Sequence, residues 1–144
     1  MKVHKMLAGK GDKVMTVRAD ATIATASEIL KKERIGALIV SDDGIKMQGI
    51  LSERDIVRGL VSHGEGLLNM RVAQLMTSDV KTCTLDDNIQ EVMSAMTRGR
   101  IRHLPVVDEN KLCGMISIGD VVKNRLEELE AETTVLRDYI AGRA

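Results

Sequence analysis

Two short motifs combine residue types that can bind an anion or a sugar. One places Asp55 three residues after Ser52, and the other places Asp120 three residues after Ser117. A glycine and two apolar residues precede each serine, and apolar residues follow each aspartate. This order predicts a strand that runs into a helix, with serine as the N-cap and aspartate as the third helical residue. The free N–H groups at such a helix start favour an anion.

A single copy of this motif has an ordinary structural explanation. Ser-x-x-Asp is also the pattern of a capping box, which stabilises a helix and binds nothing. A cap requires neither the leading glycine, Gly49 or Gly114, nor a second copy of the motif. The repeated motif therefore favours a ligand site over a cap alone.

The motifs belong to a longer internal repeat, which is the first feature to seek in a new sequence. Apolar and acidic positions of the first half recur in the second half at one offset, and one residue is lost before the second glycine. The matching pairs are Asp20 and Asp86, Ile23 and Ile89, Ile35 and Ile101, Leu38 and Leu104, Val40 and Val106, and Asp42 and Asp108. Two copies are too few for a solenoid, so we expect a pseudo-twofold pair of units.

Each copy has the pattern strand, helix, strand, strand, helix. We expect the first unit at residues 14–61 and the second at 80–125, with a helical lead-in at 1–13, a linker at 62–79 and a helical extension at 126–144. Hydrophobic periodicity and turn residues place the elements within the units. The expected helices are 2–7, 20–30, 53–61, 72–76, 88–97 and 118–141, and the expected strands are 14–17, 37–40, 46–51, 81–84, 103–107 and 112–116.

The last expected helix is long and amphipathic. Val122, Leu126, Leu129, Leu136 and Ile140 follow at helical spacing, and the opposite faces are charged. Such a stripe either packs on its own unit or joins two subunits. Its length favours a subunit contact for part of the helix.

The chain resembles a tandem pair of cystathionine-β-synthase (CBS) domains, also called a Bateman module. The resemblance rests on the repeated Gly-apolar-apolar-Ser-x-x-Asp motif, on residues 102–108 (Arg-His-Leu-Pro-Val-Val-Asp) and on Met76-Thr77 before the second unit. It implies an α/β (α+β) fold of two pseudo-symmetric β-α-β-β-α units packed as one module. It also implies clefts between the units that hold adenosine-containing ligands.

The resemblance and the residue chemistry together suggest how a nucleoside would be held. Asp55 and Asp120 only accept hydrogen bonds when ionised, which suits ribose hydroxyls. Ser52 and Ser117, with the helix N–H groups, suit a phosphate or ribose oxygen. The expected base contacts are the side chains of Ile50 and Met115, the main chain of Gly36, Ala37, Leu104 and Pro105, and Thr16 and Thr82 at the starts of the units.

Arg102 and His103 are the expected phosphate ligands, because a guanidinium offers a bidentate fork and histidine adds a donor. Arg54 and Arg100 are candidates to assist, although an isolated arginine is more often a solvated surface residue. The first unit has Gly36 and Ala37 where the second has Arg102 and His103. We therefore expect two non-equivalent sites.

Composition argues against several other functions. The chain of 144 residues is 44% hydrophobic but 1% aromatic, so base-stacking platforms for single-stranded nucleic acid are nearly lacking. A formal net charge of zero means that the chain has no excess of positive charge with which to bind DNA or a membrane surface. Cys83 and Cys113 are expected as buried thiols in a reducing cytoplasm, and His4 and His63 lack neighbouring metal ligands in the sequence. No targeting or membrane-spanning pattern is expected.

These features predict a regulatory module rather than an enzyme. It would sense AMP, ADP, ATP or NAD(H) and pass occupancy to a partner protein by a conformational change. A homodimer is expected, since the final helix and the apolar residues Ile56, Val57, Leu60, Val121 and Val122 exceed what so small a body can bury. The alternatives are a dimeric scaffold with vestigial sites and, with less support, an enzyme that acts on the nucleotide.

Overall fold

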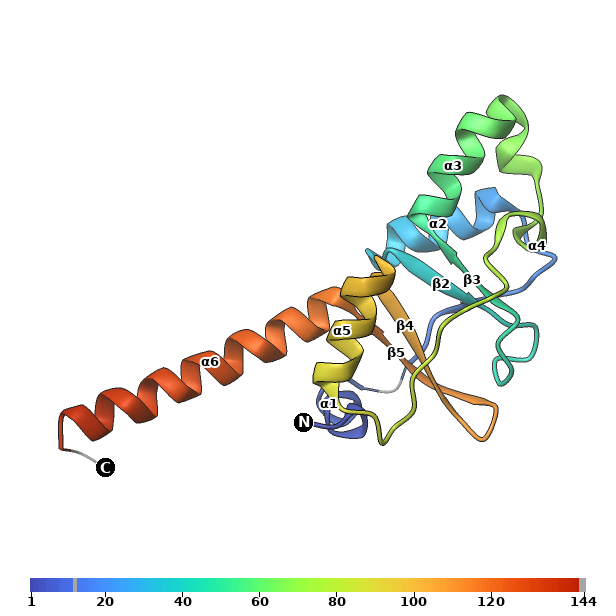
Figure 1. Cartoon of the computed structure of the whole chain (residues 1–144). Coiled ribbons are helices and arrows are strands. Elements are labelled where there is room, and N and C mark those ends of the chain that lie inside the picture. The colour runs from blue at the N-terminus through green and yellow to red at the C-terminus, as the bar shows by residue number, and fades with distance from the viewer. Residues whose placement is uncertain (12, 143–144) are drawn as a thin grey trace.

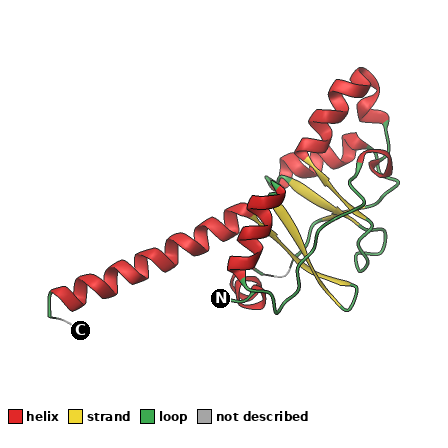
Figure 2. Ribbon diagram, in the orientation of Figure 1, coloured by secondary structure: helices red, strands yellow, loops and turns green. Residues whose placement is uncertain are grey.

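The structure is a computed structural model that describes residues 1–11 and 13–142 (Figure 1). Helices and small sheets form a mixed α/β body, as predicted, and one long helix projects from it (Figure 2). The elements in chain order are α1 (Val3–Lys10), β1 (Thr16–Val17), α2 (Ile23–Glu33), β2 (Ala37–Val40), β3 (Gly49–Ser52), α3 (Glu53–His63), the 3-10 helix η1 (Gly64–Asn69), α4 (Val72–Leu75), α5 (Ile89–Gly99), β4 (His103–Asp108), β5 (Lys111–Ser117) and α6 (Ile118–Ile140).

The two units share one strand arrangement. In the first unit, β1 pairs parallel with β2, which pairs antiparallel with β3. In the second unit, β4 and β5 form the matching antiparallel pair. All four residues of β2 are fully buried, which explains its uninterrupted apolar sequence. The register pairs Ala37 with Ser52 and, at the equivalent place, His103 with Ser117.

The first strand of the second unit is shorter than predicted. Residues 81–84 form no named strand, and only Cys83 makes a parallel bridge to Val106. The Cys83 N–H still donates to the Pro105 carbonyl at 3.0 Å, and the Val107 N–H donates to the Cys83 carbonyl at 2.9 Å. The chain therefore keeps the position of the missing strand with a single bridging residue.

Each unit is completed by the segment that precedes the other unit. Helix α1, which comes before the first unit, buries Val3, Met6 and Leu7 in the core of the second unit. Val72 of α4, which comes before the second unit, is buried in the core of the first. The backbone bonds match as well: Val3 N–H donates to Asp87 O at 2.9 Å, and Val72 N–H donates to Ala21 O at 2.8 Å. The lead-in segments thus cross between the units.

Several predicted boundaries were wrong by a few residues. Helix α1 continues through Gly9 and Lys10, and Gly11 ends it at a φ of 99°. Strand β3 begins only at Gly49, because Asp43 and the Ser41 hydroxyl hold the preceding loop through backbone hydrogen bonds. Helix α3 continues to His63 and is followed by η1, so much of the expected linker is helical.

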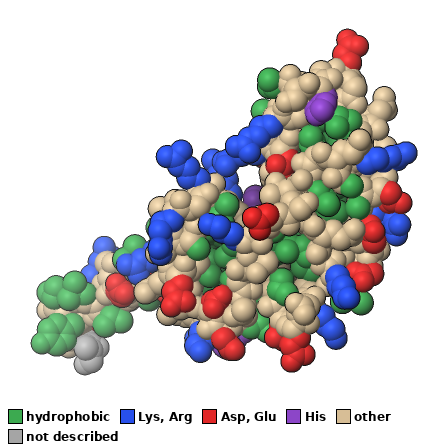
Figure 3. Space-filling model, turned by 45° about the vertical axis from the view of Figure 1, so that its right-hand side comes forward, with side chains coloured by type: hydrophobic (Ala, Val, Ile, Leu, Met, Phe, Trp, Pro, Cys, Tyr) green, Lys and Arg blue, Asp and Glu red, His purple; other side chains and the backbone are tan. Residues whose placement is uncertain are grey.

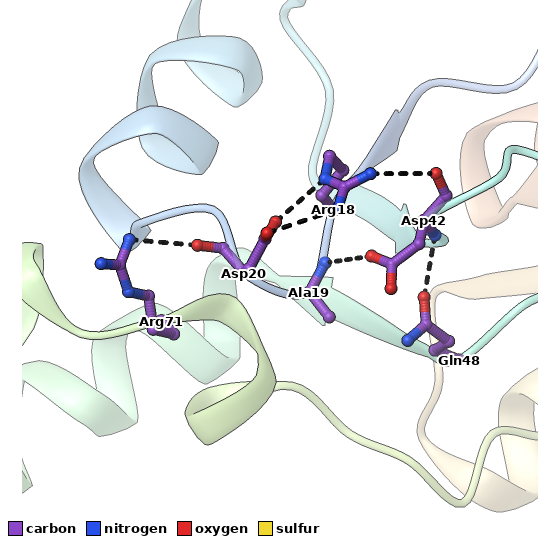
Figure 4. A network of polar contacts seen from close by, with 6 residues as sticks. All are labelled: Arg18, Ala19, Asp20, Asp42, Gln48 and Arg71. Atoms are coloured by element: carbon purple, nitrogen blue, oxygen red, sulfur yellow. Dashed lines mark hydrogen bonds and ion pairs between the residues drawn. The ribbon is translucent and has the colours of Figure 1, made fainter.

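A polar network ties the first unit together on its surface (Figure 4). The Asp42 carboxylate accepts from the Ala19 N–H at 3.0 Å, and the Asp42 N–H donates to Gln48 at 2.8 Å. Asp20 pairs with Arg18 through its carboxylate and accepts from Arg71 at its main-chain oxygen. Because these contacts are exposed, we assign them to fixing the turn before α2 rather than to large stabilisation.

Helix α6 begins at the predicted residue and extends far from the body (Figure 1). Val121, which we expected on an exposed face, is instead fully buried in the second core, and Ile56 packs against the first core. Other apolar residues remain exposed, including Val57, Leu60 and Val122. On α6 itself, the exposed fractions are 55% for Leu126, 58% for Leu136 and 76% for Ile140.

Candidate ligand-binding site

Both Ser-x-x-Asp motifs form the predicted strand-to-helix junction with a complete capping box. The Ser52 hydroxyl accepts from the Asp55 N–H at 3.2 Å, and Asp55 Oδ2 accepts from the Ser52 N–H at 2.9 Å. Ser117 and Asp120 make the same pair of bonds at 3.2 and 2.8 Å. The cap explanation therefore applies to both copies. It uses one oxygen of each carboxylate and leaves acceptor capacity for a ligand.

The two aspartates have different neighbours from the lead-in segments. Asp55 Oδ1 accepts from the hydroxyl of Thr77 at 3.2 Å, which is a neutral donor. Asp120 Oδ2 instead accepts from the ammonium of Lys10 at 2.5 Å, and Lys10 also donates to the Met115 carbonyl at 2.6 Å. The two aspartates therefore have unlike neighbours, and these neighbours come from outside the repeated motif. That the two sites differ in ligand binding stays a prediction.

The environment of Asp120 favours its ionised form. Burial acts to raise the pKa of this carboxyl group, but the Lys10 ammonium and the Ser117 N–H outweigh burial. The resulting pKa lies below the ordinary value of 3.8. Asp120 is therefore a carboxylate at neutral pH, as a ribose acceptor must be.

The units meet closely where Gly36 faces His103. A Cβ atom added at Gly36 would lie 3.1 Å from His103 Cε1 and 3.8 Å from the carboxyl carbon of Glu53. Beside this contact, Arg54 donates from Nη1 to the Arg100 carbonyl at 3.2 Å, which joins the two units. The space-filling view shows a hollow with Lys and Arg side chains along one side, acidic side chains beside it and a histidine at its base (Figure 3).

His103 carries little positive charge at neutral pH. Burial lowers its pKa below the ordinary 6.5, and Lys10 and Arg102 act in the same direction. Glu53 and Asp120 oppose the shift without cancelling it. An incoming anion would change this balance, because it stabilises the protonated ring.

The remaining predicted residues differ in their exposure. Ile50 and Met115 are half-buried on β3 and β5, while Thr16 is half-buried on β1 and Thr82 is exposed. Arg102 and Arg54 are also exposed. The side chains of Ala37, Leu104 and Pro105 belong to the buried interior, so only their main chains could contact a ligand.

Some of the main-chain groups expected to contact the base are already used by the fold. The Gly36 carbonyl accepts from the Glu53 N–H at 2.9 Å, and the Pro105 carbonyl accepts from Cys83. The main chain of Ile50, whose side chain was expected to contact the base, also bonds to Thr77 through its N–H and carbonyl, both at 2.9 Å. A carbonyl oxygen has a second lone pair, so the base contacts remain a prediction at these positions.

The leading glycines have a packing reason that we did not expect. A Cβ atom at Gly49 would lie 2.6 Å from the Thr77 carbonyl, and one at Gly114 would lie 2.9 Å from a methyl of Leu7. The absence of a side chain at both glycines therefore leaves room for the lead-in segments, which pack there at Thr77 and Leu7. The glycine was used above as a sign of a ligand, but the structure explains it by this close approach.

Sequence reasoning missed Lys10 and Glu53, and it noted Thr77 only as part of the family resemblance. Lys10 contacts a residue 110 positions away, so no local spacing signals the contact. The crossed packing of α1 on the second unit is what brings it there. The only available signal was the repeat itself, since α1 and α4 are equivalent lead-in helices.

Other features of the described residues lie outside this site. A cavity of about 270 Å³ between α5 and α6 is lined by Met1, Met93 and Arg125, among others. Among residues 1–11 and 13–142, no cluster of three potential metal ligands occurs. In the same residues, every helix is too short or too polar to cross a bilayer.

The comparison with known families settles the family of the chain. The model of the CBS domain matches twice, at residues 11–62 and 72–127. The chain belongs to the CBS domain family. The matched ranges contain both capping boxes and both sheets. The predicted family is thereby confirmed.

Proteins named for CBS domains align with most of this chain. The chain is 35% identical over 127 residues to the CBS domain-containing protein CBSX3, mitochondrial, of Arabidopsis thaliana, a match that covers 85% of this chain and 62% of that protein. It is 28% identical to the CBS domain-containing protein YhcV of Bacillus subtilis, with 82% and 83% covered. This CBS pair therefore spans less than two thirds of the length of CBSX3.

Solved structures share the fold. The CBS-domain containing protein ATU1752 of Agrobacterium tumefaciens aligns with a TM-score of 0.83 at 40% identity, covering 87% of this chain and 99% of that one. The CBS domain pair of protein MJ0100, in complex with 5′-methylthioadenosine and S-adenosyl-L-methionine, aligns with a TM-score of 0.75 at 25% identity, covering 85% and 98%. CBS pairs of this fold thus include one that binds adenosine-containing ligands.

Proposed function

We propose that this CBS pair is a regulatory module that binds an adenine nucleotide, of the AMP, ADP, ATP or NAD(H) type, and signals its occupancy. The observation that carries the proposal is the repeated helix N-terminus with its capping aspartate, close to the contact between the two units. A ribose accepts and donates through its hydroxyls, which suits Asp55 and Asp120. The adenosine ligands of the MJ0100 domain pair support this ligand class.

The contacts of the lead-in segments provide a route for the signal. A ribose at Asp55 would compete with the Thr77 hydroxyl, and a ribose at Asp120 would compete with Lys10. Both competitors belong to segments that connect one unit with the other. Ligand binding would therefore change the relative stability of two arrangements of the units, which is the requirement for a population shift. A regulated protein partner would respond to that shift.

We infer a binding role rather than catalysis from the state of the polar groups. The hydroxyls of Ser52 and Ser117 accept from helix N–H groups as caps. Asp55 and Asp120 are held in place by the same caps. Groups fixed in this way are suited to holding a ligand in one orientation. The Ser52 hydroxyl also donates to Asp55 Oδ2 at 3.1 Å, but the same oxygen already accepts from the Ser52 N–H as part of the cap.

The direct test is to denature the purified protein and identify released small molecules by mass spectrometry. Co-purified AMP, ATP or NAD would support the sensor, and a thermal shift with a nucleotide panel would extend the test to weak ligands. Arg102 and His103 are expected to read phosphate, so AMP should bind more tightly than adenosine, and their double alanine variant should lose the difference. Turnover of the nucleotide would contradict the binding role.

The exposed stripe on α6 supports a second candidate, a dimeric scaffold. Leu126, Leu129, Leu136 and Ile140 are exposed on a helix that reaches beyond the body (Figure 1). A twofold contact would bury such a stripe against the same stripe of a second copy. If no nucleotide binds and the chain dimerises, the scaffold replaces the sensor.

A further inference from the structure

Lys10 lies inside the candidate second site, although it comes from the segment before the first unit. Its ammonium contacts two residues predicted for that site, at 2.5 Å from Asp120 Oδ2 and 2.6 Å from the Met115 carbonyl. The buried residues Val3, Met6 and Leu7 fix α1 on the second unit, so the backbone of Lys10 has a defined place. We propose that Lys10 makes the second site selective for adenosine ligands that carry a phosphate. This inference rests on the proposed function.

The charges around His103 explain why Lys10 should favour a ligand that carries a phosphate. Lys10 and Arg102 are cations whose charge reaches the His103 ring, and Glu53 and Asp120 are the opposing anions. At present Asp120 neutralises Lys10 directly. When ribose hydroxyls take up the acceptor sites of Asp120, the ammonium of Lys10 loses that partner. A phosphate oxygen would replace it with a charge-assisted hydrogen bond.

Adenosine ligands without a phosphate would leave the Lys10 ammonium without an anionic partner. A neutral thioether, as in 5′-methylthioadenosine, offers only a weak acceptor to a partly desolvated cation. A sulfonium group, as in S-adenosylmethionine, brings a second positive charge toward Lys10. The second site should therefore rank AMP first among these three ligands.

Lys10 can make the required movement. Its side chain is 37% exposed, and a lysine carries its charge on a flexible four-carbon stem. The equivalent position at the first site is the neutral hydroxyl of Thr77. The first site therefore serves as an internal comparison, where this source of phosphate preference does not act.

The test follows both sites separately by ¹³C-methyl NMR of the methionines in the full chain. Met115 reports the second site, and Met76, which packs against Gly49, reports the first. The probes are AMP, 5′-methylthioadenosine and S-adenosylmethionine. The variants are Lys10→Gln, which removes the charge, Lys10→Arg, which keeps it, and Lys5→Gln, a matched control at an exposed lysine of the same helix.

In the unmodified protein, we expect AMP to shift the Met115 signal at a dissociation constant at least about tenfold below that of 5′-methylthioadenosine. Lys5→Gln and Lys10→Arg should retain this ratio, and Lys10→Gln should reduce it to about threefold or less. An unchanged ratio in Lys10→Gln overturns the inference and leaves the proposed function in place. Binding seen only at Met76 also overturns it, whereas the absence of any shift with all three ligands overturns the proposed function as well.

Discussion

Gly49 lies so close to Thr77 that a Cβ atom on the glycine would be 2.6 Å from the threonine carbonyl oxygen. The same backbone contact continues at Ile50, which exchanges two hydrogen bonds with Thr77. Thr77 also donates its hydroxyl to Asp55. The segment before the second unit is therefore part of the first candidate site, and the glycine is what permits its approach.

Replacing Gly49 by alanine should lower the free energy of unfolding by about 1–3 kcal/mol, because backbone rather than a flexible side chain meets the new methyl group. Gly114→Ala should cost less, since its nearest neighbour is the end of the Leu7 side chain. Gly9→Ala is the control, because nothing lies within 4 Å of its Cβ position and alanine favours a helix. Urea unfolding measures all three, and equal stability of Gly49→Ala and Gly9→Ala would contradict the assigned contact.

Asp120→Ala should weaken adenosine ligands at the second site by about 1–3 kcal/mol, the usual scale for a hydrogen bond to a charged group. The same change removes half of a capping box, so stability should also fall by about 0.5–2 kcal/mol. Calorimetry and urea unfolding separate the two effects, with the exposed Asp86→Ala as the control. Reduced stability together with unchanged affinity would mean that the motif acts only as a helix cap.

The buried His103 should make stability depend on pH. Its pKa is lowered in the folded state, so the unfolded chain takes up a proton more readily below the ordinary value of 6.5. The stability that this group contributes is complete above pH 6.5, and it is lost as the pH falls from 6.5 through the lower pKa of the folded state. Urea unfolding at pH 7.5 and 5.5 should show a smaller loss in His103→Gln than in the unmodified protein. The exposed His63→Gln should behave like the unmodified protein, and identical losses in all three would rule out His103 as the source.

The exposed stripe on α6 predicts a homodimer that depends on this helix. Light scattering should give twice the chain mass for the intact protein and a weaker dimer for a truncation that ends at Glu127. Leu136→Glu should weaken the dimer, because Leu136 is 58% exposed on the stripe, whereas Thr134→Glu on another face should not. A monomeric intact protein refutes the dimer, and an equally tight truncated dimer assigns the contact to another surface.

The two cysteines should react at very different rates. Burial and the negative charge of Asp87 raise the pKa of the Cys83 thiol to about 12, so almost no thiolate forms at neutral pH. Cys113 is only partly buried and should be alkylated first. Mass spectrometry after timed alkylation checks this order, and urea should make both residues reactive. Faster labelling of Cys83 in the folded protein would contradict its burial.

Much of the fold followed from the sequence because the repeat is dense in local signals. The capping serines marked the starts of α3 and α6 to the residue, and the buried β2 was visible as an uninterrupted apolar run. Cap chemistry and hydrophobic periodicity act over three to four residues, so a single sequence reveals them. Elements with little periodic signal, such as β3 and the bridge at Cys83, were placed less accurately.

The family and the positions of Ser52, Asp55, Ser117 and Asp120 were determined by the sequence alone, since they depend on local order and on its repetition. Only the tertiary structure decided which residues complete the two sites. The crossing of α1 and α4 places Lys10 beside Asp120 and Thr77 beside Asp55. The direct contact of the two units places His103 against Gly36. These contacts join residues far apart in the chain and depend on how the units pack. Residue spacing could not predict these contacts, because the packing of buried side chains, rather than local propensity, sets the geometry of the contacts.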